Sequence, residues 1–290
     1  MAKVIAVANQ KGGTSKTTST VNIGAGLARE GKRVLLIDAD PQGSLTASLG
    51  YVEPDELENT LTTIMSRLIN EACEDDSYSE FGENTNRFFG MLPHEEGVTL
   101  LPANIELSGL EVSLVNVLSR ETVLRRYIET IREDFDYILI DCTPSLGMLT
   151  LNALSAADSV LIPVQAEYLP VKGLQQLLET ITRVKRRLNS KLEVEGILMA
   201  MTNSRTVYGR EFASFLRRNY GSNVTIFKSD IPRSVRASEA SSLGISIFEH
   251  APNSRVAEAY QSLVNEILSQ RIGASQVYRF LKGQEVRAHG

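Results

Sequence analysis

Short, unbroken apolar runs recur along the chain, and longer stretches with apolar residues at helical spacing separate them. Unbroken runs are typical of parallel strands that helices cover on both faces, because a strand with one solvated face alternates apolar and polar residues. The expected strands are Val4–Ala8, Val34–Ile37, Tyr137–Ile140 and Val160–Val164, with Val194–Met201 and Val98–Leu101 as further candidates. This alternation predicts an α/β fold: a doubly wound, mostly parallel sheet with helices on both faces.

The clearest predicted helix is Thr17–Arg29. It carries Val21, Ile23 and Leu27 at near-helical spacing, and Gly31 follows as a residue that commonly ends helices. The longer helical candidates are Val171–Leu188 and Arg255–Leu268.

Residues 53–90 are the least regular part of the chain and include an acidic run at 71–77. Here we expect a short helix, Leu61–Ile69, followed by a surface loop. We interpret the whole stretch as an insertion in a single domain that covers residues 1–272. Residues 273–290 then form a C-terminal tail, whose apolar segment Val277–Leu281 could dock on another surface.

The composition is that of an ordinary globular protein: 290 residues, 42% hydrophobic and 22% charged. Cys73 and Cys142 are far apart and lack the spacing of metal ligands, which favours a reducing compartment. No apolar run approaches the roughly 18–20 residues that span a bilayer, and the N-terminus does not have the pattern of a signal peptide. We therefore expect a cytoplasmic protein.

The charge is unevenly distributed. The net charge is −5, yet residues 183–236 hold twelve Lys and Arg against four Asp and Glu, a local balance of +8. This asymmetry suggests one basic face on an acidic body, which fits contacts with DNA phosphates. Solvated charge is the alternative for any single residue, and the polar face of a helix is the simpler reading of Arg183 and 185–187.

The first chemical motif is the turn after the first predicted strand, Lys11-Gly12-Gly13-Thr14-Ser15-Lys16-Thr17-Thr18. A phosphate needs several backbone N–H groups that point into one concavity, with a helix N-terminus behind them. Gly12 and Gly13 let the backbone approach a ligand closely. Lys16 supplies charge for the β- and γ-phosphates, and Thr17 a hydroxyl for Mg²⁺. Ser15 stands where the common pattern has a glycine before this lysine.

Acidic residues end two of the predicted strands. Asp38 and Asp40 follow an apolar run at the edge where open α/β sheets bind ligands, and residues two apart on a strand point the same way. Both could therefore reach one metal–phosphate centre. Asp141 follows four apolar residues in the Walker B pattern, whose carboxylate orders the Mg²⁺ shell.

Together, Lys11, Asp40 and Asp141 make a family resemblance specific. The chain resembles ParA/Soj-type partition ATPases of the deviant Walker A group, which also includes MinD. The resemblance runs through KGGTSKTT, LLIDADPQG, LPA, YILIDCTPS, IPVQAEYLPVKGL and IPRSVRASEASSLG. The chain departs from the family at Thr14-Ser15 and at the acidic segment 71–83, which has no counterpart that we can assign.

The resemblance implies ATP or ADP and Mg²⁺ as ligands of the loop Lys11–Thr18. It implies that Lys11 reaches across a dimer to the partner's nucleotide. Lys16 and Thr17 would be the lysine and the Mg²⁺ ligand of the chain's own site.

The remaining site residues are implied in the same way. Asp40 would position the attacking water, and Asp38 and Asp141 would be acids of the outer Mg²⁺ shell. Asn203 and Pro232 fall where the family holds the adenine.

The function implied is a slow, partner-stimulated ATPase that dimerises with ATP, binds DNA non-specifically and segregates plasmid or chromosome DNA with a ParB-like centromere-binding protein. Such a protein is associated with the nucleoid. The implied DNA contacts are Arg233 and Arg236, followed by Arg205, Arg210, Arg217, Arg218 and Lys228.

Two alternatives share these motifs. The same switch could position a protein cargo on the nucleoid. A MinD-like membrane switch is disfavoured, because the tail is short for an amphipathic membrane helix and Gly283 interrupts it. Electron-transfer and metal-pump relatives need clustered cysteines, which this chain lacks.

Overall fold

The computed structural model describes residues 1–74, 87–165, 170–203 and 207–270. Within them the sheet has eight strands in the order β3-β4-β2-β5-β1-β6-β7-β8. Neighbouring strands are parallel except β3 and β4. The strands are β1 (Lys3–Val7), β2 (Val34–Ala39), β3 (Leu92–Pro93), β4 (Val98–Leu101), β5 (Tyr137–Cys142), β6 (Ser159–Gln165), β7 (Glu193–Thr202) and β8 (Ile226–Pro232). The predicted fold class is confirmed.

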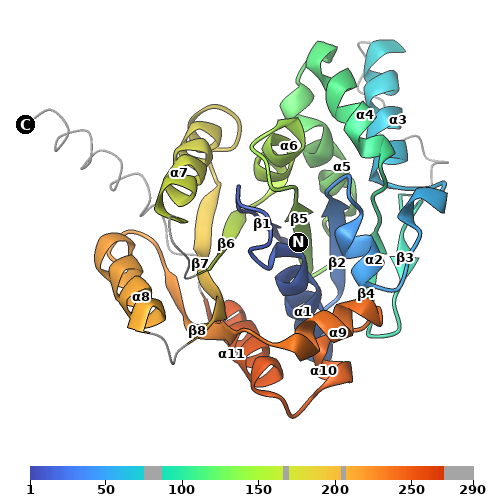
Figure 1. Ribbon diagram of the computed structural model, residues 1–290. Helices are drawn as coiled ribbons and strands as arrows, with labels where there is room; N and C mark the ends of the chain where they lie inside the picture. Colours follow the sequence, from blue (N-terminus) through green and yellow to red (C-terminus); the bar gives the residue numbers. More distant parts are fainter. Residues whose placement is uncertain (75–86, 166–169, 204–206, 271–290) are drawn as a thin grey trace, which may run out of the picture.

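Helices cover both faces of this sheet (Figure 1). One face carries α1 (Lys16–Arg29), α2 (Ser44–Ser48), α9 (Val235–Ser242), α10 (Ile247–His250) and α11 (Arg255–Ser269). The other carries α3 (Leu61–Glu74), α4 (Glu106–Ser113), α5 (Val123–Ile131), α6 (Met148–Ala156), α7 (Pro170–Arg187) and α8 (Val207–Tyr220). Single 3₁₀ turns occur at Pro54–Glu56, Leu114–Asn116 and Arg120–Thr122.

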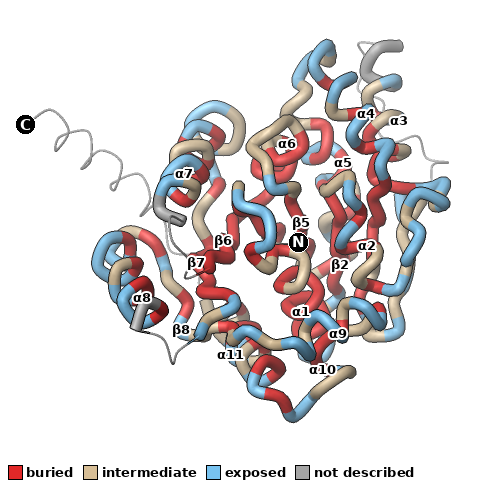
Figure 2. Tube along the Cα trace, viewed as in Figure 1, coloured by how far each residue is buried: buried red, intermediate tan, exposed pale blue. Residues whose placement is uncertain are grey.

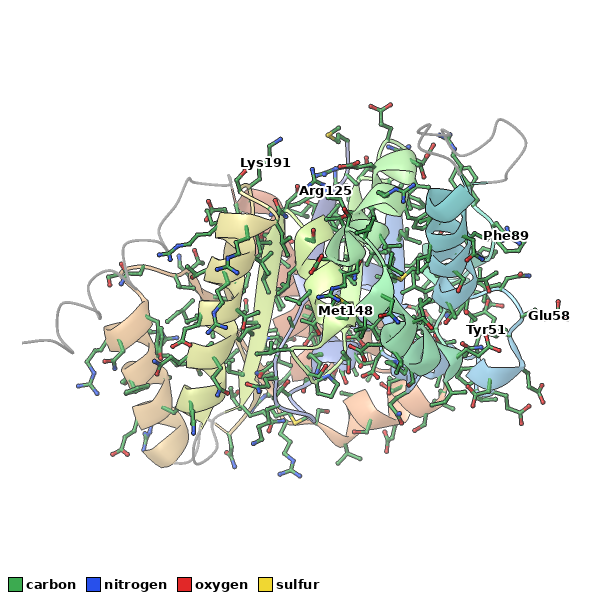
Figure 3. The ribbon with its side chains drawn as sticks, turned by 90° about the horizontal axis from the view of Figure 1, so that it is seen from above. Tyr51, Glu58, Phe89, Arg125, Met148 and Lys191 are labelled. Atoms are coloured by element: carbon green, nitrogen blue, oxygen red, sulfur yellow. The ribbon has the colours of Figure 1, made fainter. Side chains whose placement is uncertain are left out.

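The core therefore has two halves, one on each side of the sheet. Figure 2 shows the buried positions running along the strands, with the outer surfaces of α7 and α8 exposed. In β2 every residue is buried, which is the reason for its unbroken apolar sequence. Seen from above in Figure 3, side chains fill the space between the two layers of helices and the sheet.

All six predicted strands are present, with ends shifted by at most two residues, but β3 and β8 were not predicted. β8 lies at the edge of the sheet, and it mixes buried Phe227 and Ile231 with exposed Lys228. A search for unbroken apolar runs misses such a strand, because an edge strand can leave one side solvated.

The irregular stretch contributes more to the core than expected. Helix α3 continues to Glu74, beyond the predicted end at Ile69, and it buries Leu61, Met65 and Leu68. The division into domain and tail stays a prediction. Most of the acidic loop and the whole tail lie outside the described residues.

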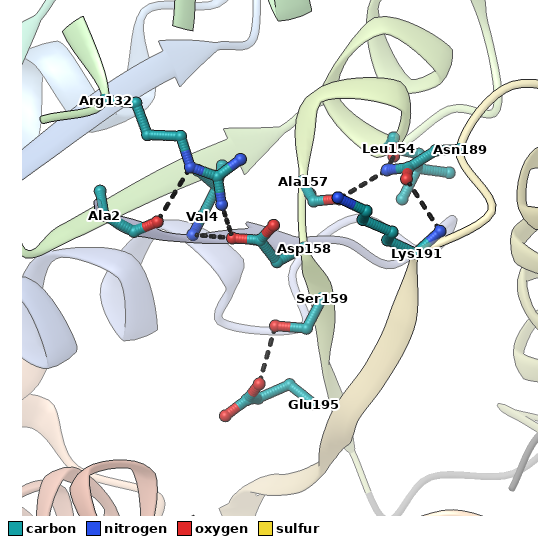
Figure 4. Close-up of polar contacts among 10 residues, drawn as sticks. All are labelled: Ala2, Val4, Arg132, Leu154, Ala157, Asp158, Ser159, Asn189, Lys191 and Glu195. Atoms are coloured by element: carbon teal, nitrogen blue, oxygen red, sulfur yellow. Dashed lines mark hydrogen bonds and ion pairs between the residues drawn. The ribbon is translucent and has the colours of Figure 1, made fainter. Parts of the chain in front are cut away.

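Polar contacts fasten the edge of the sheet at which β1 begins (Figure 4). Arg132, after α5, donates to the carbonyl of Ala2 at 3.1 Å and pairs with Asp158, whose carboxylate also accepts the N–H of Val4 at 2.9 Å. Beside them Glu195 pairs with Lys3 at 2.6 Å. The loops that follow β1, β2 and β5 lie at the opposite side, where these strands end.

Candidate nucleotide-binding site

The loop between β1 and α1 is held in shape by its own side chains. Asn9 Nδ2 donates to the carbonyl of Pro163 in β6 at 2.6 Å, and its Oδ1 accepts the N–H of Lys11 at 3.0 Å. Thr14 Oγ1 donates to the carbonyl of Lys11 at 3.2 Å. The loop is thus tethered to the neighbouring strand and closed on itself.

Two residues of the loop have left-handed backbone conformations: Gly13, with φ 70°, and Ser15, with φ 66°. A Cβ atom added at Gly12 or Gly13 would meet no heavy atom within 4 Å. The glycines therefore border open space next to the amino end of α1, where a phosphate could approach the backbone amides. The left-handed Ser15 explains why glycine is usual at its position.

The two lysines of the loop differ in exposure. Lys16 begins α1 and is 7% exposed, whereas Lys11 is exposed. One loop thus holds one ammonium group inside the protein and a second at its surface.

Asp141 lies at the end of β5 directly behind the loop and is 1% exposed. Its Oδ2 accepts a hydrogen bond from Thr17 Oγ1 at 2.6 Å. Burial and the charge of Asp38 raise the pKa of Asp141, and they outweigh the opposite effects of the Thr17 hydrogen bond and of Lys16.

Asp38 is fully buried in the adjacent strand, and its oxygens are occupied by protein donors. Oδ2 accepts from Thr46 N at 2.8 Å and Thr46 Oγ1 at 2.7 Å, and Oδ1 accepts from Asp40 N at 3.1 Å. Burial raises the pKa of Asp38 in spite of these bonds. Asp38 thus anchors α2 and the turn after β2.

Asp40 lies beyond the last residue of β2. The rule that residues two apart on a strand point the same way therefore does not apply to Asp38 and Asp40. It is half-buried, and its Oδ1 accepts the N–H of Gln42 at 3.0 Å. Asp40 borders the open edge of the sheet, whereas Asp38 is enclosed.

The donors near the loop suit Mg²⁺: the Thr17 hydroxyl and, behind it, two carboxylates. Among the described residues no group of three or more His, Cys, Asp and Glu could hold a metal alone. Mg²⁺ usually completes its octahedron with substrate phosphates and water, so this sparse set fits a metal that enters with its nucleotide.

A pocket of ≈ 990 Å³ opens beside the loop. Ser15 and Thr18 form one wall, and Asn203 and Pro232, the residues predicted to hold adenine, form another. Arg233, which we predicted to contact DNA, also lines it. The structure thus joins the two predicted base-binding residues to the phosphate loop. The pocket is further lined by Met201, Thr202, Ile231, Arg236, Arg255 and Tyr260, among others.

Of the other predicted DNA contacts, Arg236 also lines this pocket, and the rest that the structure describes lie apart from it. Arg210, Arg217 and Arg218 are exposed on α8 and line a shallow hollow, and Lys228 is exposed on β8. Arg205 lies outside the described residues.

Sequence reasoning missed two residues that shape the site. Thr46 binds Asp38 and also accepts the N–H of Ala103 at 3.1 Å, and no sequence signal marks it. Gln165 contacts the phosphate loop from β6, and its only signal is its place within the family segment IPVQAEYLPVKGL.

Comparisons with known proteins agree with this geometry. A family model described as an AAA domain matches residues 2–194. The sporulation initiation inhibitor protein Soj of Bacillus subtilis is 43% identical over 92% of this chain and 98% of its own length. The chromosome partitioning protein ParA of Caulobacter vibrioides is 38% identical over 92% of this chain and 94% of its own.

A solved structure of a Mycobacterium smegmatis protein, described as a cobyrinic acid a,c-diamide synthase with a bound ATP analog and magnesium, is 35% identical with a TM-score of 0.77. The match covers 95% of this chain and 99% of that one.

A parallel sheet with its phosphate loop after the first strand is the architecture of P-loop ATPases, and these relatives place the chain in that class. It is an ATPase whose ligands are ATP, ADP and Mg²⁺. More particularly, the chain belongs to the ParA/Soj family of partition ATPases.

Proposed function

We propose that this chain is an ATP-dependent dimerising switch that binds DNA non-specifically and drives DNA segregation or positioning with a ParB-like partner. ATP brings two copies together, the dimer holds duplex DNA by its phosphates, and the partner ends the bound state by stimulating slow hydrolysis. Relatives named chromosome partitioning protein ParA support DNA as the cargo.

The observation that carries this proposal is the contrast between Lys16, enclosed at the start of α1, and Lys11, exposed on the same loop. An enclosed lysine can serve only its own nucleotide, whereas an exposed one can reach a nucleotide in a second copy. A charge supplied by the partner would make ATP bind the dimer more tightly than the monomer, so ATP would shift the population to dimers.

Hydrolysis needs positioned groups more than covalent chemistry. In the proposal Lys16 neutralises phosphate charge, Thr17 and Asp141 order the magnesium shell, and Asp40 orients the attacking water. Asp38 acts indirectly, since its bonds to Asp40 N and Thr46 fix the turn that carries Asp40.

The exposed arginines of α8 and Lys228 are our candidates for DNA contacts. Arginines on one helix face can meet successive phosphates without reading the bases, which gives salt-sensitive, sequence-blind binding. Arg233 and Arg236 also line the nucleotide pocket, so a DNA contact there would respond to nucleotide occupancy. This activity places the protein on the nucleoid, in the cytoplasm.

In the part of the chain that the structure describes, no helix is long and apolar enough to cross a membrane.

The proposal is tested by sizing the Asp40→Ala protein with Mg²⁺ and ATP, with and without a random-sequence duplex. Because this variant should bind ATP but not turn it over, we expect a lasting dimer that co-migrates with DNA. A monomer that binds ATP under these conditions contradicts the proposal.

A second substitution separates the exposed lysine from mere ATP binding. Lys11→Ala in the Asp40→Ala background should still bind ATP but remain monomeric. The matched control is Lys191→Ala. Lys191 is exposed in the turn between α7 and β7 (Figure 3), at the end of the strands opposite the phosphate loop, so its replacement should leave the dimer intact.

A further inference from the structure

Gln165 is the last residue of β6 and is only 7% exposed. A buried amide must find partners, because burying an unsatisfied polar group is costly. Its Nε2 donates to the carbonyl of Gly13 in the phosphate loop and to the Met201 sulfur at 2.8 Å. Since neither partner has a hydrogen to give, the amide must present its nitrogen to both.

The bond to Gly13 fixes a peptide plane where the loop has most freedom. Gly13 has φ 70°, and no atom lies where its Cβ would be, so packing does not hold it. In a trans peptide the C=O and the next N–H point in opposite directions, so a carbonyl turned to Gln165 turns the N–H of Thr14 away. A flipped plane would present an oxygen where a phosphate-binding loop needs an N–H.

The second partner lies on the wall of the nucleotide pocket. Met201 follows the buried part of β7, has a left-handed backbone with φ 50° and lines the pocket beside Asn203. Left-handed residues other than glycine persist where their surroundings hold them. One buried amide thus touches both the phosphate loop and the wall proposed to hold the base.

We propose that Gln165 is a positioning residue for nucleotide binding: it orients the Gly13–Thr14 peptide for the phosphates and links that peptide to the base side through Met201. The inference rests on the proposed phosphate-binding role of residues 11–18. It involves no contact between Gln165 and the nucleotide.

The test compares Gln165→Leu and Gln165→Glu with the wild-type protein, using calorimetric titration with ATP and, separately, with adenosine. Loss of the buried hydrogen bond should weaken ATP binding by about tenfold in Gln165→Leu. Gln165→Glu should weaken it further, because a carboxylate would face the Gly13 carbonyl. Adenosine affinity should change much less, since adenosine has no phosphates.

Two outcomes would overturn this inference. One is an unchanged ATP affinity in both variants. The other is an equal loss of affinity for ATP and for adenosine, because an equal loss would mean general damage to the pocket. Gln176→Leu, the same change at an exposed position of α7, is the matched control and should bind ATP normally. A wild-type protein that bound no ATP would instead contradict the proposed site itself.

The link to Met201 is tested by a double-mutant cycle. Met201→Leu keeps the side-chain size and removes the sulfur, so it should weaken ATP binding slightly alone and add nothing in the Gln165→Leu background. Additive losses would show that the two contacts are independent. If Gln165→Leu fails to fold, the isosteric Gln165→Glu replaces it in the double-mutant cycle with Met201→Leu.

Discussion

At the scale of single residues, the site combines strained backbone with buried charge. Ser15 and Met201 have left-handed backbones without being glycine, and Asp38 and Asp141 are carboxylates inside the protein. Such costs are tolerated at functional sites because the surrounding structure holds them in place. Here the surrounding structure includes Thr46, which binds Asp38 through both its N–H and its hydroxyl.

The strain at Ser15 gives a stability prediction. Its side chain makes no capping bond at the start of α1, so only its backbone matters here. A left-handed conformation costs an L-residue roughly 1–2 kcal/mol, whereas glycine tolerates it but loses more chain entropy on folding. Ser15→Gly should therefore be more stable than Ser15→Ala by about 1 kcal/mol in urea unfolding. Equal stabilities would argue against the strained conformation.

The buried acids predict how stability depends on pH without Mg²⁺. Because the folded protein raises the pKa of both carboxyls, it binds more protons than the unfolded chain, and stability falls as the pH rises through the folded pKa values. The thermal midpoint of the metal-free protein should thus decrease between about pH 5 and about pH 8. Mg²⁺ with ATP, which favours the ionised acids, should stabilise the protein more at the alkaline end.

Two substitutions check this origin. Asp38→Asn removes one of the two carboxyls and should flatten the profile. Asp136→Asn is the control, because the Arg33 guanidinium lowers the pKa of that exposed carboxyl to about 2, far below this window. A steep profile that survives Asp38→Asn would place the proton uptake elsewhere.

At the scale of elements, α2 and α9 connect the two sides of the site. Asp38 anchors α2, and the glycines that follow these helices, Gly50 and Gly244, lie against each other. The β3–β4 hairpin also binds the turn that contains Gly244, because Glu96 accepts the N–H of Ser246 at 2.6 Å. Helix α2, which begins after the turn that carries Asp40, and helix α9, which borders the nucleotide pocket, thus meet through the residues that follow them.

Gly244→Ala should break that contact. A Cβ at Gly244 would lie 2.5 Å from the Gly50 Cα, and φ is +72°. Gly31 has nearly the same φ, +73°, but open space around its Cβ position. Gly31→Ala should cost about 1 kcal/mol for its backbone alone, and Gly244→Ala at least about 1 kcal/mol more. Denaturant unfolding measures the free energy of unfolding of both variants. Equal losses would mean that the Gly50–Gly244 contact adjusts to the extra methyl group at little cost.

At the scale of the whole molecule, charge is distributed by face. Helix α8, on which Arg210, Arg217 and Arg218 are exposed, lies on the outside of the molecule, away from α1 and the predicted phosphate loop before it (Figure 1). A protein with net charge −5 can still bind DNA if its basic residues gather in this way. Binding then depends on the local surface rather than on total charge.

This gives a prediction about salt. If Arg217 and Arg218 each neutralise one phosphate, replacing both with Ala should weaken duplex binding and reduce the slope of log K against log salt by about 1 per contact. Fluorescence anisotropy with Asp40→Ala and ATP measures it. Arg125→Ala, a surface arginine paired with Glu129 on α5, should leave the slope unchanged. An unaltered slope in the double variant would remove α8 from the DNA interface.

The sequence by itself determined the fold class, six of the strands and the loop Lys11–Thr18, because these depend on local apolar runs, glycines and charges that lie close together in the chain. Only the tertiary structure decided that Asp38 faces Thr46 rather than the open site, that Gln165 holds Gly13, and that Asn203 and Pro232 share a pocket with Ser15. The physical reason is that these contacts join residues distant in sequence, whose side-chain directions are set by where each strand ends and how neighbouring strands pack.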